Sequence, residues 1–404
     1  MPGTERATEQ RTELERPQAL EPYTLHVFDQ SYFSGKMQAY LAFKEIPHRS
    51  HVVSWRELTA RIAPHTGLVE VPVLECADGT FLRDSTAMIE WMEPRYPQGR
   101  VLPDDEAAAF VCRLLEDYGD EGLWRPALYY RWAFSRDALL NARLFVEDWL
   151  RFPLTAPFVL RLFVRRRQQR AYMGGEGITA TNRGDVERHY LDELADLDAI
   201  FRKRPYLFGA RPSLADFGYF ASMFRHFGID PTPARLMRER APAVYEWVAR
   251  MWNSRASRLE AARWCSDPAV PADLEPLLAR AARRYLPVLH ANARAVADGR
   301  SSFDATIDGK AYPGLAAVPF QAWRRSVLQR ALAGLSAEAG ADVRDLLQRS
   351  GCLVWLEKDG ILDHRYPEGD ALPHGRPRHI GLLEKARMQM FGTPHHHEAG
   401  TAGH

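Results

Sequence analysis

The sequence has few cysteines and almost no net charge. Its 4 cysteines, Cys76, Cys112, Cys265 and Cys352, lie far apart without metal-ligand spacing, so we expect reduced core residues, no disulfide framework and no metal. With 53 Lys and Arg against 52 Asp and Glu, the net charge of +1 argues against a nucleic-acid partner. With 46% hydrophobic and 26% charged residues, the chain can bury a large core.

Long apolar runs are also absent. The most apolar stretch, residues 158–164, is shorter than the roughly 20 residues that span a bilayer, and it leads into Arg165, Arg166, Arg167 and Arg170. We expect a buried helix with a solvated basic end here, in preference to a membrane-surface helix, and no peripheral membrane contact. Residues 1–22 are polar and Glu-rich, unlike a signal peptide, and are expected to be disordered in a cytoplasmic protein.

The most informative stretch is residues 71–93. A Val71-Pro72 step opens an apolar run, Asp78-Gly79 is typical of a two-residue hairpin turn, and a second run ends in Asp84-Ser85 at a helix start. Proline cannot donate to a strand ladder, so Pro72 is expected to begin an edge strand or to follow a cis peptide bond. The main chain of Val71 is then available to a peptide-like ligand, and the amides and the Ser85 hydroxyl at the helix start favour a carboxylate.

The upstream sequence predicts a strand, a helix and a second strand. Residues 23–28 are rich in β-formers, residues 29–33 lead into a helix with apolar residues at helical spacing, and residues 44–48 turn into the next strand. The loop into the helix, residues 31–36, contains serines but no cysteine. Thiol–disulfide exchange, which requires a protein thiolate, is therefore disfavoured.

This order of elements resembles the glutathione-binding half of glutathione transferases, which is a thioredoxin-like domain. The resemblance covers about residues 23–255 and implies glutathione as the co-substrate. It places Ser31 at the catalytic position, with Tyr32 as the rival donor, and Ser31 or Ser34 as a plain helix cap remains open. The resemblance also implies that Val71, shaped by Pro72, pairs with the cysteinyl unit, while Asp84 and Ser85 hold the γ-glutamyl end.

Beyond Pro103 the periodicity becomes helical. Residues 186–201 carry a clear apolar stripe, and Ser213 with Asp216 reads as a capping box, the motif that nucleates the helical domain of glutathione transferases. Core packing is the usual role of helical aromatics. The candidates for lining a hydrophobic co-substrate pocket are Tyr118, Trp124 and Tyr129.

The 404 residues are enough for two or three domains. We expect an α/β thioredoxin-like domain, an all-helical domain and an additional α+β extension. In the extension the sequence predicts helices at 272–298, a hairpin at 303–312, one or two helices at 320–348 and a hairpin at 353–362. His395, His396 and His397 lie in a tail expected to be unfolded. The expected divisions are a disordered segment at 1–22, the thioredoxin-like domain at 23–100, the helical domain at 104–265, the extension at 270–390 and the tail at 391–404.

One departure from the family bears on function. Many relatives have a basic residue before the Val-Pro step, near the glycine carboxylate of the ligand, whereas this chain has Glu70. His65 and Arg61, in the preceding segment, are the candidates for compensating this change. The chain also resembles the metaxin and failed-axon-connections group, which lacks established catalysis. We therefore expect a glutathione transferase acting on a hydrophobic electrophile, with a non-catalytic binding or scaffold protein as the alternative; homodimers are usual among relatives.

Overall fold

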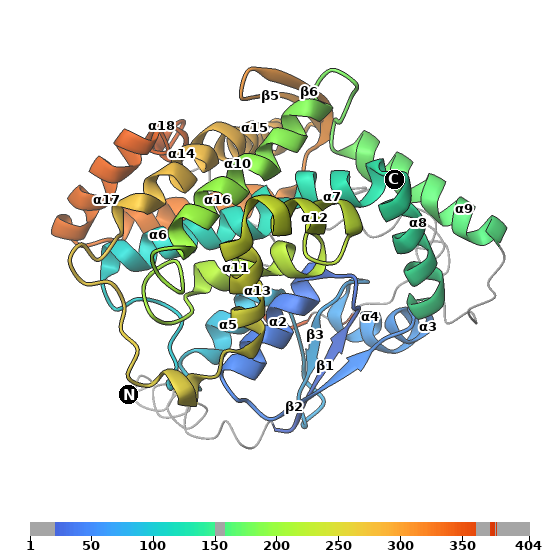
Figure 1. Ribbon diagram of the computed structural model, residues 1–404, viewed down its shortest axis with the longest axis horizontal. Coiled ribbons are helices and arrows are strands. Elements are labelled where there is room, and N and C mark those ends of the chain that lie inside the picture. The colour runs from blue at the N-terminus through green and yellow to red at the C-terminus, as the bar shows by residue number, and fades with distance from the viewer. Residues whose placement is uncertain (1–20, 150–157, 361–371, 376, 378–404) are drawn as a thin grey trace, which may run out of the picture.

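The structure is a computed structural model that describes residues 21–149, 158–360, 372–375 and 377 (Figure 1). The expected fold class, a thioredoxin-like α/β domain followed by an all-helical domain and an α+β extension, is confirmed. The predictions for residues 1–20 and for the histidines of the tail lie outside the described residues.

The first domain is built on a four-stranded sheet of order β2-β1-β3-β4. β1 is parallel to β2, and β3 runs antiparallel to both β1 and β4. The strands are β1 (Tyr23–Val27), β2 (His48–Val52), β3 (Val73–Glu75) and β4 (Phe81–Arg83), and the helical segments are α2 (Tyr32–Phe43), α3 (Trp55–Glu57), η2 (Leu58–Ile62), α4 (Ala63–Thr66) and α5 (Ser85–Met92).

The turn between β3 and β4 lies where the sequence predicts it, but it is longer than the expected two residues. The Cys76 amide donates to the Thr80 carbonyl at 2.8 Å and the Gly79 amide to the Cys76 carbonyl at 3.0 Å, so residues 77–79 form the connection. Gly79 has a φ of 86°, the left-handed conformation that favours glycine. The Val71–Pro72 peptide bond is cis, the second of the two expected alternatives. The first alternative is wrong, because β3 is an inner strand paired on both sides and β4 is the edge.

The outer edge of β4 is covered by a distant part of the chain. The amide of Arg83 donates to the carbonyl of Pro373 at 2.8 Å, and the amide of Gly375 donates to the carbonyl of Phe81 at 2.9 Å. These two bonds continue the sheet by a short antiparallel bridge. They satisfy main-chain groups that an open edge strand leaves unpaired.

The helical domain packs on the first domain mainly through α11 against α2. The predicted stripe at 186–201 is buried in α10, and the predicted capping box is present, with the Ser213 side chain accepting from the Asp216 amide and the Asp216 carboxylate accepting from the Ser213 amide. The helices are α6 (Glu106–Asp117), α7 (Trp124–Ala133), α8 (Ser135–Leu144), α9 (Phe158–Gln168), α10 (Arg183–Phe201), α11 (Leu214–Arg225), α12 (Pro231–Arg240) and α13 (Pro242–Asn253), with π-helical segments η3 (Tyr118–Gly122), η4 (Phe145–Trp149) and η5 (Gln169–Gly174) and a 3₁₀ turn η6 (Ala256–Leu259).

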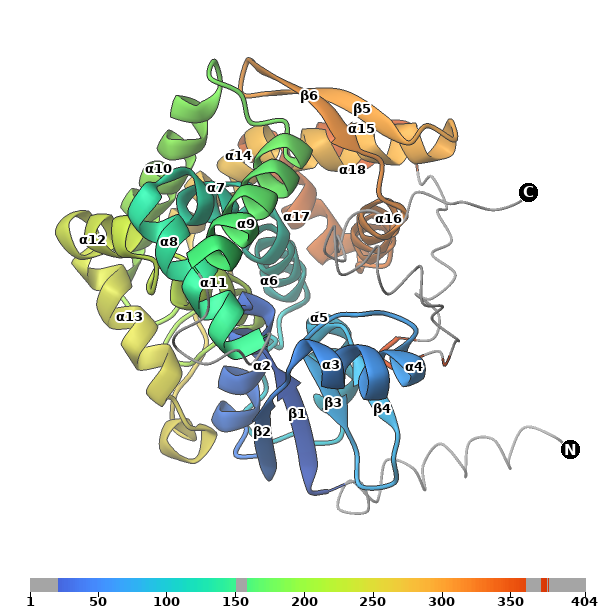
Figure 2. The ribbon, with the colours of Figure 1, turned by 90° about the vertical axis from the view of Figure 1, so that its right-hand side faces the viewer.

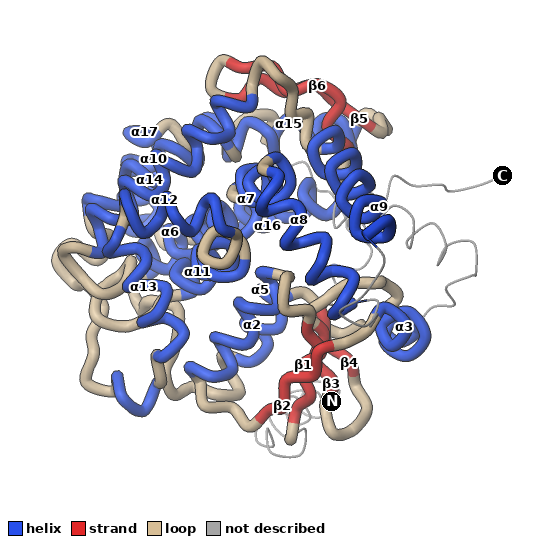
Figure 3. The backbone as a smooth tube through the Cα atoms, turned by 45° about the vertical axis from the view of Figure 1, so that its right-hand side comes forward, coloured by secondary structure: helices blue, strands red, loops and turns tan. Residues whose placement is uncertain are grey.

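The expectation of a buried helix at α9 is wrong. Phe158, Val159 and Phe163 are 66%, 74% and 61% exposed, whereas Val164 and Gln168 are buried and Leu160 packs on a hydrophobic cluster of the helical domain. Figure 3 shows α9 on the outside of the helical domain. Hydrophobicity alone did not fix the buried face, because the apolar residues of this helix do not share one side.

The extension lies along α6 and α10, and in Figure 2 its hairpin and α15 lie at the upper right with α16 and α17 below them. Its hairpin runs over α15, and α16 and α17 pack on α6. The elements are η7 (Ala272–Leu274), α14 (Glu275–Arg284), α15 (Leu286–Ala297), β5 (Ser302–Ile307), β6 (Lys310–Ala316), α16 (Pro319–Ala333), α17 (Ala337–Ser350) and α18 (Leu353–Glu357).

The predicted hairpin at 353–362 is wrong, because its first half is α18. Asp359 and Gly360 have positive φ angles, as a hairpin turn requires, but they follow a helix. Arg325 of α16 donates to the carbonyls of Trp355 and Lys358 at 2.8 Å each, which satisfies the end of this helix. Arg325, a buried residue about 30 positions earlier in the sequence, therefore stabilises a helix where the local sequence predicted a hairpin.

All 4 cysteines are free, and Cys76, Cys112 and Cys352 are buried as expected, whereas Cys265 is half-buried and lies outside the core clusters. Among the described helices, none is long and apolar enough to cross a membrane.

Candidate functional site

Strand register gathers the predicted glutathione-binding segments at one end of the sheet. His26 of β1 lies opposite Val73 of β3, and Val73 lies opposite Arg83 of β4. β1 leaves the sheet just beyond this row, β3 enters at it, and β4 leaves at it. Because antiparallel neighbours meet at the same edge, the loop to Ser31, the Val71–Pro72 step and the Asp84–Ser85 pair all emerge together.

The serines at the start of α2 have separate tasks. Ser31 is the N-cap, and its side-chain oxygen accepts a hydrogen bond from the Ser34 amide at 3.3 Å. Ser34 is fully buried, and its hydroxyl oxygen accepts from the Phe28 amide at 3.2 Å. Since Ser31 accepts through its oxygen as a cap, its own proton stays available for donation.

Tyr32 points into the helical domain. Its hydroxyl donates to the carbonyl of Asp120 at 2.7 Å, and the side chain is 1% exposed. Burial raises the pKa of this phenol well above its usual value. The Tyr32 hydroxyl is thus committed to a contact between domains.

The Val71–Pro72 step offers an open main chain. Val71 is buried, and its amide and carbonyl form no hydrogen bond with the described part of the chain. The neighbouring Glu70 pairs with Arg83 at 3.1 Å. Acidic Glu70 is therefore neutralised within the protein.

Asp84 and Ser85 form the start of α5. Asp84 is the N-cap and accepts from the Ala87 amide at 2.9 Å, with a φ of 68° and a ψ of 112° that side-chain-bearing residues rarely adopt. Such strained positions concentrate at ligand sites. The amides of Ser85 and Thr86 have no partner among the described residues, which leaves two donors at the positive end of a helix.

The two residues expected to compensate for Glu70 are already engaged. Arg61 binds both carboxylate oxygens of Glu75, at 2.8 and 2.7 Å. His65 stacks on Phe81 with ring centroids 4.5 Å apart. Neither contact directs a cation toward the Val71 main chain.

A buried ion network ties the helix starts to the helical domain. Lys36 of α2 is 0% exposed and binds Glu116 at 2.6 Å and Asp120 at 2.7 Å. Thr86 of α5 donates to the same Glu116 oxygen at 2.6 Å and accepts from Lys36 at 2.9 Å. One carboxylate of α6 therefore holds α2 and α5 in a fixed relation.

The extension completes this network. Arg324 of α16 binds Asp117 and reaches Glu116 at 3.7 Å, while Tyr285 donates to Asp117 at 2.6 Å. Burial would raise the pKa of Glu116, but Lys36 and Arg324 hold it below its usual value. The buried acids of α6 are thus balanced by cations from the first domain and from the extension.

The next two acids along the chain have raised pKa values. Burial raises the pKa of Asp120 to about 7 and that of Glu121 to about 8, since the opposing effects of Lys36 and Arg324 are smaller. Near neutral pH, Glu121 is therefore mainly protonated, and Asp120 titrates. This limits the net negative charge buried between the domains.

The structure does not bring Tyr118, Trp124 and Tyr129 together in one pocket. Tyr118 is fully buried and donates to Glu193 at 2.7 Å. Tyr129 donates to Glu187 at 2.5 Å and lines a groove on another face. Only Trp124 lies beside the Ser31 loop, with its ring 5.6 Å from Tyr32 and 6.2 Å from Phe33.

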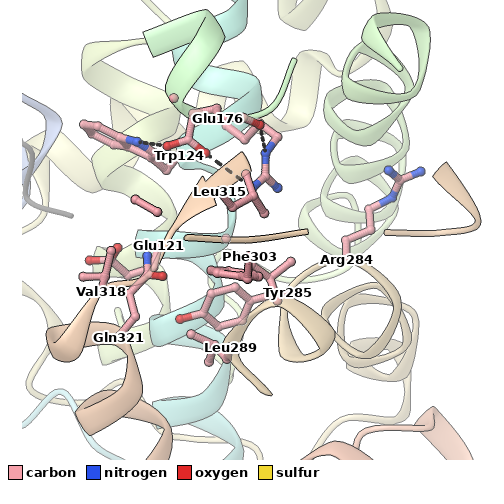
Figure 4. Close-up of a pocket in the computed structure, with 15 residues that line it drawn as sticks. Glu121, Trp124, Glu176, Arg284, Tyr285, Leu289, Phe303, Leu315, Val318 and Gln321 are labelled. Atoms are coloured by element: carbon pink, nitrogen blue, oxygen red, sulfur yellow. Dashed lines mark hydrogen bonds and ion pairs between the residues drawn. The ribbon is translucent and has the colours of Figure 1, made fainter. Parts of the chain in front are cut away.

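Trp124 also borders a small cavity of about 60 Å³ between the helical domain and the extension (Figure 4). Its indole donates to Glu176 at 3.0 Å, and Arg125 pairs with the same carboxylate at 3.4 Å. Glu121 and Tyr285 are among the residues that line it. The cavity is large enough only for a few water molecules, and none of its lining residues belongs to the sheet-end segments.

Sequence reasoning missed the network of Lys36, Glu116, Asp120 and Arg324. The partners are too far apart in sequence for spacing rules. The one local signal is charge within apolar surroundings: Lys36 interrupts a hydrophobic helix, and residues 116–121 place several acids among buried aromatics. Within the described residues, no cluster of three or more His, Cys, Asp or Glu side chains has the geometry for a metal ion.

Comparisons with known proteins agree with this architecture. Residues 25–100 match the family described as glutathione S-transferase, N-terminal domain, and residues 168–250 match glutathione S-transferase, C-terminal domain. The search of curated proteins found no match.

Similar solved structures include a glutathione S-transferase from Methylobacterium radiotolerans JCM 2831 in complex with glutathione sulfonate, with 18% identity, 62% of this chain and 94% of that chain covered and a TM-score of 0.36. Another is β-etherase LigF from Sphingobium sp. strain SYK-6, with 18% identity, coverage of 59% and 98% and a TM-score of 0.43. A third, from Methylobacillus flagellatus KT with glutathione bound, has 20% identity, coverage of 59% and 98% and a TM-score of 0.39. The two domain matches, in this order along one chain, show that the protein belongs to the glutathione transferase superfamily and carries an extension beyond its helical domain.

Proposed function

We propose that the protein is a glutathione-dependent transferase that activates the glutathione thiol for attack on a hydrophobic electrophile. The observation that carries the proposal is the row His26, Val73 and Arg83, which brings three donor and acceptor segments to one end of the sheet. Glutathione presents a thiol, peptide groups and a γ-glutamyl end, and each has a matching segment there.

The peptide part of glutathione pairs with the main chain of Val71. Both groups of this residue are without a partner in the described chain, next to a buried strand end. A peptide ligand that donates to the carbonyl and accepts from the amide extends the sheet by strand addition. This contact recognises a peptide without regard to its side chains.

The γ-glutamyl end binds at the start of α5. Its carboxylate accepts from the unpartnered amides of Ser85 and Thr86 and from the Ser85 hydroxyl, favoured by the helix dipole. Its ammonium lies near the Asp84 carboxylate. The unusual backbone of Asp84 turns these groups toward the ligand.

The thiol lies at Ser31. The Ser31 proton is donated to the thiolate, and the start of α2 adds its partial positive charge, so that the thiol pKa falls below its reference of about 8.5. Trp124, which packs on Tyr32 and Phe33 beside this loop, is proposed to contact the electrophile. We further propose that the protein is a cytoplasmic homodimer. Sedimentation equilibrium would measure its mass.

The experiment is the consumption of glutathione thiol with an aromatic halide, compared between the wild type and Ser31→Ala. The proposal expects turnover in the wild type and a loss of about ten-fold or more in the variant, with similar glutathione affinity. Equal turnover in both proteins would remove Ser31 from the mechanism.

A non-catalytic binding or scaffold protein is the second candidate. The observation that favours it is the pairing of Glu70 with Arg83 and of Arg61 with Glu75, which engages both arginines that the described chain places near the Val71 step. Glutathione binding without turnover of any electrophile would favour this candidate.

A further inference from the structure

A second concavity lies on the helical domain, away from the sheet. It is an open groove of about 1030 Å³ between the end of α7, the segment α9–η5 and the start of α10. Its floor includes Tyr129, Trp132, Phe134 and Met173. Its volume is at the upper end of the range of small-molecule sites.

The rim of this groove is positively charged. Arg166, Arg170 and Arg183 line it and are exposed, and none of the three forms an ion pair with another described residue. The acid in the lining is Glu187, whose carboxylate accepts the Tyr129 hydroxyl at 2.5 Å. Three cations without an ion pair in the described chain, around one acid, give the groove a positive balance.

The exposed face of α9 continues the groove as a stripe. Val159, Phe163 and Arg166 are spaced four and three residues apart, so they share one side of the helix. The first two are 74% and 61% exposed, and Arg166 belongs to the groove. An apolar track therefore leads to a cationic rim and an aromatic floor; Figures 1 and 3 show α9 at the periphery of the helical domain.

We propose that this groove binds a long-chain carboxylate of the fatty-acid type. The guanidinium groups of Arg166, Arg170 and Arg183 bind the carboxylate, because their planar donor sets match its two oxygens. The alkyl chain covers the aromatic floor and the track formed by Val159 and Phe163, removing exposed apolar surface from water. Charge and shape together select an anion with an extended apolar body over a short acid or a neutral lipid.

The groove shares no lining residue with the proposed glutathione site. The described residues that line the groove run from position 129 to position 187, whereas the sheet-end segments come from residues 28–86. The ligand is thus a second molecule, bound beside the helical domain.

The test is calorimetric titration of the full-length protein with dodecanoate below its micelle concentration, alongside butyrate and dodecanol. We expect saturable binding of dodecanoate and at least ten-fold weaker binding of the other two. Arg166→Gln/Arg170→Gln should weaken dodecanoate binding ten-fold or more and leave the melting temperature unchanged, since both side chains are exposed. Arg136→Gln, an exposed arginine of α8 outside the groove, is the matched control and should bind like the wild type.

A third variant tests the apolar track, and vesicles test another occupant. Phe163→Ser should weaken dodecanoate and leave butyrate unaffected. Equal affinity of the double variant and the Arg136→Gln control would overturn the assignment. So would an absence of saturable dodecanoate binding accompanied by sedimentation with anionic phospholipid vesicles, because the surface would then bind a membrane.

Discussion

Ser31 and Tyr32 are adjacent in sequence, yet their hydroxyl groups form different kinds of hydrogen bond. The Ser31 oxygen accepts from the backbone and keeps its proton, whereas the Tyr32 proton is held by the carbonyl of Asp120. Adjacency in sequence left both as candidates for thiol activation. The position of each proton favours Ser31 in our proposal.

Ser31→Ala should raise the pKa of bound glutathione by about one to two units, because a hydrogen bond to a charged group contributes roughly 1.5–3 kcal/mol. Affinity should change little, since Ser31 contacts only the thiol in this proposal. Thiolate absorbance against pH measures the shift. Tyr32→Phe should leave that pKa unchanged and cost about 1 kcal/mol of stability; the reverse pattern would make the tyrosine the donor.

Ser85→Ala should weaken glutathione binding by about 1–2 kcal/mol, through loss of one donor to the γ-glutamyl carboxylate. Calorimetry gives the affinity, and the melting temperature must be followed because Ser85 is buried. Ser301→Ala, an exposed serine of the extension, is the control. A folded Ser85→Ala protein with unchanged affinity would remove this residue from the site.

At the scale of elements, α2, α5, α6 and α16 are joined by buried charges. Lys36→Met should destabilise the protein by about 3–5 kcal/mol, because Glu116 and Asp120 lose a buried cation. Adding Asp120→Asn should restore part of this loss. Urea unfolding measures both, and a neutral effect of Lys36→Met would show that the network contributes little to stability.

Glu121 should make the free energy of unfolding depend on pH with a sign opposite to that of an ordinary ion-paired acid. Its folded pKa is raised to about 8 by burial, so between about 4.5 and 8 the folded state binds more protons than the unfolded state. Stability should therefore fall as pH rises through this window. Glu121→Gln should flatten the decline in melting temperature between pH 6 and 9, and an unchanged slope would contradict the raised pKa.

The sequence predicted those elements whose turn, capping or periodicity signals lie within a few neighbouring residues. The Asp78-Gly79 turn, the capping box of Ser213 and the stripe of α10 follow from turn chemistry, capping and periodicity. Partners distant in sequence decided the rest: Arg325 stabilises α18 where a hairpin was predicted, and Lys36 reaches acids about 80 residues away. The same holds for the candidate site. Its segments were predictable from sequence, but the hydrogen bond of Tyr32 to Asp120 and the ion pair of Arg61 with Glu75 are visible only in the fold.

At the scale of the whole molecule, we propose that residues 270–390 form part of one folded body. Arg284 binds Asp185 at 2.9 Å, Arg280 binds Glu193 at 2.9 Å, and Tyr285 and Arg324 share Asp117, all in buried surroundings. Without the extension these acids would lose their cations. The boundaries of the remaining divisions stay predictions.

Limited proteolysis should accordingly yield a stable core that runs past residue 300. The stretch at 266–272, which is exposed at residues 266–268, is the nearest candidate for a linker, and cutting there should not release the extension. Rapid cleavage near residue 270 into two stable pieces that do not associate would show an independent domain.

The central claim is that this sheet end binds glutathione, and calorimetric titration of the folded, full-length protein with glutathione tests it most directly. The account predicts saturable binding at one site per chain, weakened by Ser85→Ala and unaffected by Ser301→Ala. Absence of binding to a folded wild-type protein would contradict it.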